Sequence, residues 1–378
     1  MNVLIVSQVI PQWYVDVLKK SLPDNTNIDI ITGSNVNANV IPSPKHDATS
    51  FTSRLLCWYR HLRFMNKWIK ENKNKNYDLI FAVSNPPINS YIGLKLKKTF
   101  NAPFIFMNWD IYPQCIDYMI KNPVVHFVCS LWHKWNDKNY KKIDKILTIG
   151  EIVAESINES LKNKIDISVI PIGVDCNRLS PIDKLENVFC EENGLSDKFV
   201  VLYSGKMGYG HNIELIIKGA QKLKEYKDIV FVFIGDGQKF ELVKKASEVC
   251  ENIKVYPMQS EEMFPYSMAS GDVGIVAEEE KMAHLFMPSK TYSMMACGMP
   301  VTGICSDNDD LHNLITDNNI GYTVTDGDVD KFCECILTLY NDKDLHNDMK
   351  NRSRHIAQKD YDISAVIEKY RELFKKYI

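Results

Sequence analysis

The sequence predicts an α/β protein with two doubly wound, mostly parallel sheets. Three observations support this. Short β-branched runs alternate with longer segments of helical periodicity, a second such series begins near Phe199, and a segment containing Pro and Gly separates the two series. Alternation of this kind is typical of βα units on a parallel sheet. A chain of 378 residues, 45% of them hydrophobic, is long enough for two domains that each bury a core.

The predicted strands are short apolar runs. They cover residues 3–6, 28–31, 79–83, 104–106 and 146–149, and then residues 199–202, 229–234, 253–256, 273–276, 301–304 and 321–324. Pro171, Gly173 and Pro181 break any periodic pattern between the two series. We therefore expect an N-terminal domain over residues 1–180 and a C-terminal domain over residues 181–360. Residues 361–378 are expected to form a terminal helix that packs back on the N-terminal domain, because apolar residues recur there at helical spacing.

Composition excludes several classes of protein. A formal net charge of −3 argues against nucleic-acid binding, which needs a basic excess. The ten cysteines include no C-x-x-C pair, so neither a zinc site nor a disulfide framework is expected, and a reducing cytosol is the simple interpretation. The N-terminus is typical of a buried strand rather than a signal peptide, and the apolar stretches are too short to span a membrane. We expect a cytoplasmic protein, either soluble or peripheral at the inner membrane.

Two segments of the N-terminal half combine aromatic and basic residues. In residues 50–75 a stripe of apolar residues lies beside a flank of basic residues. Residues 127–142 show the same combination of aromatic and basic residues. The stripe consists of Leu55, Trp58, Leu62, Met65 and Ile69, and the flank of Arg60, Arg63, Lys67 and Lys70. A surface helix with its stripe in the core would show the same pattern. Two such segments in one domain favour a surface that meets anionic lipid.

A glycine-rich loop, YSGKMGYGHN at residues 203–212, lies between a predicted strand and a helical pattern that starts at Ile213. Glycines at this place let backbone N–H groups approach an anion, and phosphate is the first candidate. The spacing matches neither G-x-G-x-x-G nor G-x-x-x-x-G-K-[ST], so a dehydrogenase is not favoured and a tight βα turn is an alternative.

Several pieces in order resemble one family. They are MNVLIVSQ at the start, SNPPINSYIGL at 84–94, NWDIYPQ at 108–114, VIPIGVDCNRLSP at 169–181, VVLYSGKMG at 200–208, FIGDGQKFELV at 233–243 and MPSKTYSMMACGMPV at 287–301. Together they resemble family 4 glycosyltransferases, above all the branch that builds bacterial surface polysaccharides and includes N-acetyl-fucosamine transferases. The resemblance covers nearly the whole chain.

This resemblance implies a GT-B fold, in which two Rossmann-like domains face a central cleft. The C-terminal domain would bind a nucleotide-sugar donor and the N-terminal domain the acceptor. Members of the family generally transfer with retention of configuration and without a metal, so we expect no metal and no cofactor beyond the donor. Protein groups must then neutralise the departing diphosphate.

The resemblance also assigns donor-site residues in the glycine-rich loop. Lys206 lies where the family has a basic residue, and His211 where a lysine often completes the clamp. Gly205 and Gly208 would stay small so that backbone and diphosphate can meet. A solvated loop lysine is the alternative for Lys206, and a neutral histidine would clamp a phosphate less well.

The second donor-side segment is MPSKTYSMMACGMP, where Ser289 would either cap the following helix or donate to phosphate, and Lys290 is a further cation. Leu285 and Ser293 replace the paired glutamates of the family, which leaves the sugar and ribose contacts open. Glu280, with the carboxylates that precede it, and His284 are candidates to reach the donor, although a triple carboxylate is also typical of a solvated loop.

On the acceptor side, Asp110 follows the strand at 104–106, and Trp109 stands where relatives often have histidine. The Asp110 carboxylate could orient the acceptor hydroxyl, act as a base, or cap the next helix. The segment Gly235-Asp236-Gly237 is interpreted as structural.

The predicted function is a retaining glycosyltransferase that moves a hexose or N-acetylhexosamine from a nucleoside-diphosphate donor, UDP above all, to a lipid-linked surface-glycan acceptor. The alternatives are a UDP-sugar epimerase, which needs well-placed acids and bases, and a non-catalytic partner subunit, suggested by Leu285 and Ser293.

Overall fold

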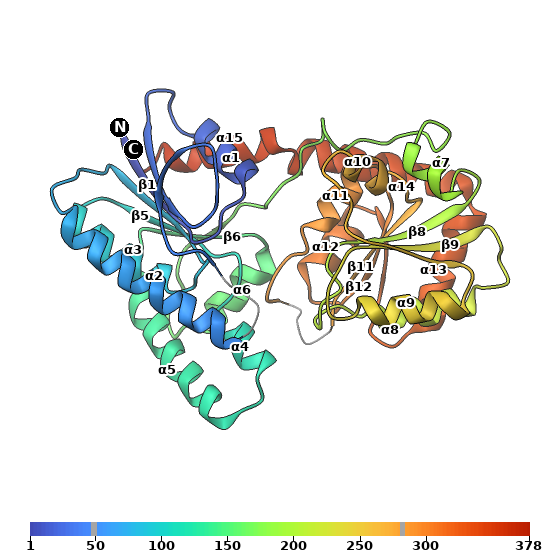
Figure 1. Cartoon of the computed structure of the whole chain (residues 1–378), viewed down its shortest axis with the longest axis horizontal. Coiled ribbons are helices and arrows are strands. Elements are labelled where there is room, and N and C mark those ends of the chain that lie inside the picture. Colours follow the sequence, from blue (N-terminus) through green and yellow to red (C-terminus); the bar gives the residue numbers. More distant parts are fainter. Residues whose placement is uncertain (47–50, 280–283) are drawn as a thin grey trace. The chain divides into compact units, whose positions relative to one another are not determined.

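The computed structural model describes residues 1–46, 51–279 and 284–378. The chain forms two compact units, one of Met1–Pro171 with Ser364–Ile378 and the other of Ile172–Ile363. Each unit is a sheet between helices (Figure 1). The expected boundaries were 180 and 360, whereas the chain changes units after Pro171 and again after Ile363.

The first unit contains a seven-stranded parallel sheet with the order β3-β2-β1-β4-β5-β6-β7. Its strands are β1 (Asn2–Val6), β2 (Asn27–Thr32), β3 (Asn39–Pro42), β4 (Leu79–Val83), β5 (Phe104–Met107), β6 (Lys145–Thr148) and β7 (Ile167–Val169). Its helices are α1 (Gln12–Ser21), α2 (Phe51–Glu71), α3 (Asn89–Phe100), α4 (Gln114–Met119), α5 (Pro123–Asn139), the 3₁₀ turn η1 (Tyr140–Lys142), α6 (Glu151–Glu159) and α15 (Ile363–Phe374). The sequence did not predict β3 and β7, because no residue of either strand is buried and their apolar runs are correspondingly weak.

Side chains cover both faces of this sheet, which explains its continuous apolar strands. On one face, β4 and β5 pack against α2 and α3 in a cluster that includes Ile80, Phe104, Met65 and Leu96. On the other face, Phe81 contacts Tyr370 and Phe374 of α15. The Tyr370 hydroxyl in turn lies 2.6 Å from the Tyr14 hydroxyl of α1.

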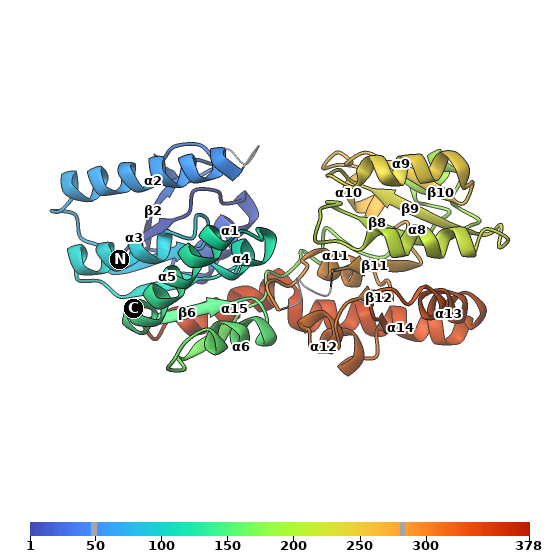
Figure 2. The ribbon, with the colours of Figure 1, turned by 90° about the horizontal axis from the view of Figure 1, so that it is seen from below.

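The apolar stripe of α2 is divided between core and surface. Met65 and Ile69 belong to the buried cluster, whereas Leu55 is 42% exposed. Figure 2 shows α2 as one long helix of this unit. The C-terminal part of the stripe therefore packs in the core, as expected of a surface helix, while Leu55 is exposed to solvent.

The second unit contains a six-stranded parallel sheet with the order β10-β9-β8-β11-β12-β13. Its strands are β8 (Phe199–Ser204), β9 (Ile229–Ile234), β10 (Ile253–Tyr256), β11 (Val273–Ala277), β12 (Val301–Ile304) and β13 (Gly321–Val324). Its helices are α7 (Val188–Asn193), α8 (Ile213–Lys222), α9 (Phe240–Val249), α10 (Phe264–Met268), α11 (Lys290–Ala296), α12 (Asp310–Asp317), α13 (Val329–Asn341), α14 (Lys343–Ile356) and the π-helical turn η3 (Ala357–Tyr361). Strands β8 and β9 pack on α8 and α13 through a cluster that includes Val201, Phe231, Ile216 and Phe332.

Two further observations concern chemistry and location. All ten cysteines lie in the described part of the chain and are thiols. Across residues 1–46, 51–279 and 284–378, we find no helix with the length and hydropathy that a membrane crossing requires.

Candidate active site

The second sheet has its topological switch point between β8 and β11. These strands are neighbours, but β8 connects to β9 on one side and β11 connects to β12 on the other. In open α/β sheets such a point opens a crevice at the carboxyl ends of the strands, where ligands bind. The two loops that begin there touch, since Glu279 N–H donates to the carbonyl of Gly210 over 3.0 Å. The predicted glycine-rich loop therefore lies at the position where a ligand is expected.

The glycine-rich loop is held by the loop after β9. Gly205 N–H donates to the carbonyl of Ile234 (2.8 Å) and Met207 N–H to the carbonyl of Asp236 (2.6 Å). Gly235 has φ +153° and Gly237 has φ +123°. A Cβ on Gly235 would lie 2.0 Å from the carbonyl oxygen of Gly205. The segment Gly235-Asp236-Gly237 is thus structural, because it lets two backbones lie in contact.

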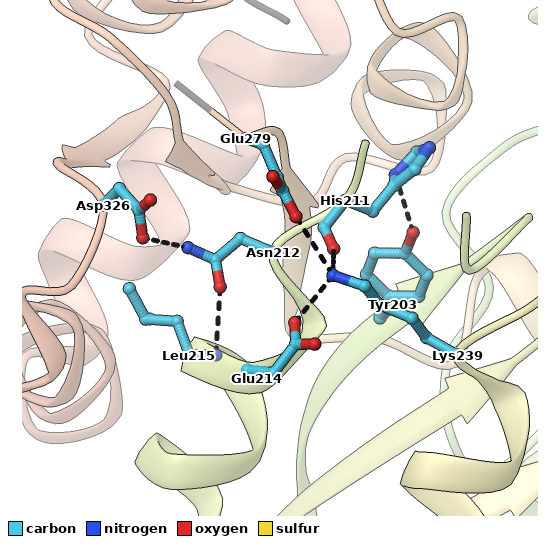
Figure 3. Close-up of polar contacts among 8 residues, drawn as sticks. All are labelled: Tyr203, His211, Asn212, Glu214, Leu215, Lys239, Glu279 and Asp326. Carbon is cyan, nitrogen blue, oxygen red and sulfur yellow. Dashed lines mark hydrogen bonds and ion pairs between the residues drawn. The ribbon is translucent and has the colours of Figure 1, made fainter. Parts of the chain in front are cut away.

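Tyr203, Lys290 and His211 form the centre of the site. Lys290 Nζ donates to the Tyr203 hydroxyl over 2.8 Å and lies 4.0 Å from the centroid of the same ring. The hydroxyl donates to the carbonyl of Lys206 (2.8 Å) and lies 3.0 Å from Nδ1 of His211 (Figure 3). Gly205 is next to this group, because a Cβ there would meet Cε of Lys290 at 3.5 Å.

Burial sets the charges of this centre. Desolvation lowers the pKa of Lys290 to about 7, although the carboxyl of Glu278 acts in the opposite direction. Desolvation, and then the charges of Lys290 and Lys239, lower the pKa of His211 to about 3. His211 is therefore a neutral imidazole at physiological pH and does not supply the cation that the resemblance led us to expect at this position.

Lys239, which the sequence did not single out, ties the two loops together. Its Nζ donates to the carbonyl of His211 (2.8 Å), to Glu214 Oε2 (2.8 Å) and to Glu279 Oε1 (3.2 Å) (Figure 3). The side chain is only 11% exposed. Its partners lie up to 40 residues away in the chain, so no local pattern could have revealed the cluster.

Asn212 anchors the end of the same loop. Its Oδ1 accepts from Leu215 N–H (3.2 Å), which caps α8, and its Nδ2 donates to Asp326 (Figure 3). This cap orients α8 directly after the glycine-rich loop.

Lys206 is exposed, and its ammonium has no ion pair within the described ranges. Gly208 does not need to be glycine for internal packing, because a Cβ there would meet Cδ2 of His211 at an ordinary 3.5 Å. Both observations leave the outer side of the loop available to a ligand.

The segment before α11 places the other predicted donor-site residues. Ser289 occupies the N-cap position, but its side chain makes no capping hydrogen bond and is exposed. The capping interpretation is therefore wrong, and the hydroxyl is available to a ligand. Ser293 lies within α11 and is half-buried, while Leu285 is buried.

Glu278 follows β11 and is 1% exposed. Neither of its oxygens has a hydrogen-bond partner in the described structure. Desolvation, and then the charge of Asp309, raise its pKa well above the usual range. His284 has φ +70° and an Nδ1 buried without a partner among the described residues, whereas Glu280 lies outside them.

Asp110 belongs to the first unit and follows β5. The backbone N–H groups of Trp109 and Asp110 donate to Ser84 Oγ over 3.0 and 3.4 Å. The next helix, α4, begins at Gln114 with Pro113 at its N-cap. Asp110 therefore does not cap it, and that alternative is wrong. Trp109 packs on Tyr14, with ring centroids 4.9 Å apart.

No cluster of three or more His, Cys, Asp or Glu side chains with metal-binding geometry is present in the part of the chain that the structure describes. The donor-side groups are instead lysines, hydroxyls and backbone N–H groups, which are suited to a phosphate.

Comparison with known proteins agrees with this geometry. Residues 189–356, within the second unit, match the family model described as Glycosyl transferases group 1. The glycosyltransferase WbjE of Pseudomonas aeruginosa is 22% identical over 273 residues, which are 69% of this chain and 67% of WbjE. Anabaena HepE in complex with UDP-glucose has a TM-score of 0.73 at 14% identity over 100% of both chains. WaaG, a glycosyltransferase involved in lipopolysaccharide biosynthesis, has a TM-score of 0.68 at 13% identity over 99% of both chains.

The two Rossmann-like units with parallel sheets thus have the GT-B fold, as the sequence predicted. The second unit contains a group 1 glycosyltransferase domain, and the protein is a glycosyltransferase.

Proposed function

We propose that the protein transfers a hexose or N-acetylhexosamine from a UDP-sugar to a lipid-linked acceptor of a bacterial surface glycan, with retention of configuration and without a metal. The observation that supports this most directly is the contact of Lys290 Nζ with the Tyr203 hydroxyl, which also donates to the backbone carbonyl of Lys206 in the glycine-rich loop at the switch point of the second sheet. A nucleoside diphosphate presents the complementary charge.

In the proposed reaction, the bond between the anomeric carbon and the β-phosphate oxygen breaks. A bond between the same carbon and the acceptor hydroxyl oxygen forms on the same face, and the hydroxyl proton passes to the departing diphosphate. Lys206 and Lys290 stabilise the negative charge that develops on the diphosphate. Asp110 orients the acceptor hydroxyl from the first unit.

Two relatives support the choice of substrates. HepE is described with UDP-glucose bound, and WaaG is described as acting in lipopolysaccharide biosynthesis. The aromatic and basic helices α2 and α5 would bring the enzyme to the cytoplasmic face of the inner membrane, where such an acceptor is embedded.

The test is a thermal-shift screen of UDP, GDP, ADP, CMP, NAD and ATP with the wild type, Lys206→Ala and the exposed control Lys218→Ala. A ligand at about 100 times its Kd stabilises the folded protein by roughly 2.7 kcal/mol, which raises Tm by several degrees. We expect a shift with UDP that Lys218→Ala retains and Lys206→Ala loses. A shift with none of the ligands, or equal shifts in both variants, would contradict the proposal.

A further inference from the structure

A groove lined by apolar side chains lies on the helical face of the first unit. It has a volume of about 640 Å³ and is lined mainly by α2, the start of α3, and α5. Leu55, Trp58, Tyr91, Val128, Trp132 and Trp135 are among its lining residues. All belong to one unit, so the groove does not depend on how the two units are placed.

Several apolar side chains that line the groove are exposed to solvent. On α5, the lining residues Val124 and Val128 are 71% and 53% exposed. Leu55 of α2 is also exposed. Large exposed apolar patches on soluble domains usually mark an interaction surface, and each such side chain would gain free energy on leaving water.

A second cavity of about 950 Å³ adjoins the groove and shares Tyr91 and Trp135 with it. The two rings are in edge contact, with centroids 6.2 Å apart. This second cavity, which we call the lysine basin, is lined by Lys95, Lys97, Lys98, Lys141 and Lys142 together with Asp144.

The lysine basin keeps an excess of positive charge. Lys97 Nζ donates to Asp144 over 2.8 Å, which neutralises one pair. Lys98 and Lys141 are exposed and have no acidic partner within residues 1–46, 51–279 and 284–378. Lys95 Nζ lies 5.2 Å from the centroid of Tyr91, at the boundary between basin and groove.

We propose that the groove and the lysine basin together bind one anionic phospholipid, with an acyl chain in the groove and the phosphate at Lys98 and Lys141. An apolar channel that continues into a cationic cavity is complementary to an amphiphile with an anionic head. A neutral lipid would leave the lysines unpaired, and a small anion would leave the groove in water. This inference rests on the membrane contact in the proposed function, but not on the sugar-transfer reaction.

The probe is dihexanoylphosphatidylglycerol, titrated as a monomer into the full-length protein by calorimetry. We expect saturable binding with one lipid per protein. Dihexanoylphosphatidylcholine has the same chains without net charge, and we expect its Kd to be about tenfold higher.

Two matched pairs of variants separate this site from general adsorption. The double variant Lys98→Glu/Lys141→Glu should raise the Kd for the anionic lipid about tenfold or more, whereas Lys134→Glu/Lys138→Glu on exposed α5 positions changes the charge equally and should have little effect. Val128→Asp places a charge in the groove, and Leu131→Asp places the same charge on α5 outside the lining. Only the former should weaken the binding of both lipids.

Equal affinities for the two lipids, or equal effects within either pair of variants, would overturn the inference. UDP-induced stabilisation of each variant checks that the fold is intact, and it also separates the two proposals. Lipid binding without a UDP shift would contradict only the donor proposal, whereas a UDP shift without saturable lipid binding would contradict only the lipid site.

Discussion

Lys290 Nζ lies 2.8 Å from the hydroxyl of Tyr203 and 4.0 Å from the centroid of its ring. The two residues are 87 positions apart in the chain, yet they meet where β8 and α11 come together. The contact orients a cation towards the glycine-rich loop, and the accompanying desolvation lowers the Lys290 pKa to about 7. A lysine of this kind can change charge near physiological pH.

The first prediction concerns the pH dependence of UDP binding. Because protonated Lys290 binds the diphosphate, the Kd for UDP should rise as pH increases above about 7, by at most tenfold per pH unit. Lys290→Met should bind UDP more weakly and lack this rise, while Lys290→Arg should bind without it because arginine stays charged. Calorimetric titrations between about pH 6 and pH 9 test this. The same slope in Lys290→Met and the wild type would assign the titration to another group.

The second prediction concerns Lys239 as a positioning residue. Lys239→Met removes the ties to Glu214, Glu279 and the carbonyl of His211, and it leaves two carboxylates uncompensated. We expect a loss of about 2 kcal/mol in unfolding free energy and a Kd for UDP about tenfold higher. Lys245→Met, an exposed change on α9, the helix that begins directly after Lys239, is the control. A double-mutant cycle with Glu279→Gln should show coupling, and simple additivity would argue against the tie between the loops.

The third prediction concerns the contact between the two glycine loops. Gly235→Ala would place a Cβ 2.0 Å from the carbonyl oxygen of Gly205, at a residue with a positive φ. We expect the unfolding free energy to fall by about 3 kcal/mol or more, and UDP binding to be lost as well. Gly327 also has a positive φ, +85°, but a Cβ there meets nothing within 4 Å. Gly327→Ala should therefore cost only about 1 kcal/mol. Urea denaturation measures both, and equal costs would mean that the loops separate without penalty.

The fourth prediction concerns stability in acid. The pKa of His211 is lowered to about 3 in the folded protein from a usual value of 6.5. The unfolded chain therefore binds a proton that the folded protein does not, and stability falls as pH decreases from 6.5 towards 3. At about pH 5 this contribution is about 2 kcal/mol.

His211→Asn should reduce the loss of stability between about pH 7 and pH 5 by that amount. Exposed His355→Asn is the matched control and should behave as the wild type. Chemical denaturation of the wild type and both variants at the two pH values measures the difference in unfolding free energy. An unchanged difference in His211→Asn would show that the imidazole is charged in the folded protein.

The sequence predicted most strands because a strand between two helical layers is apolar along its whole length. Residues 229–234 and 301–304 show this, since all of them are buried. The edge strands β3 and β7 were missed because their residues are only partly buried. The segment at 203–212 was identified because glycines and a lysine directly follow an apolar strand. The segment at 287–301 was identified through the resemblance to a family.

The tertiary structure alone decided how those segments act together. In the sequence, Tyr203 is an aromatic residue in an apolar strand. Only in the folded chain do Lys290 and His211 contact its hydroxyl. In the sequence, Lys239 is one of many lysines. In the folded chain, its ammonium contacts the loops that follow β8 and β11. Periodicity in a sequence records which face of an element is buried. The charge of an ionisable group, in contrast, depends on neighbours from distant strands and on the water they exclude, so the neutral His211 and the weakly basic Lys290 could be recognised only in the folded chain.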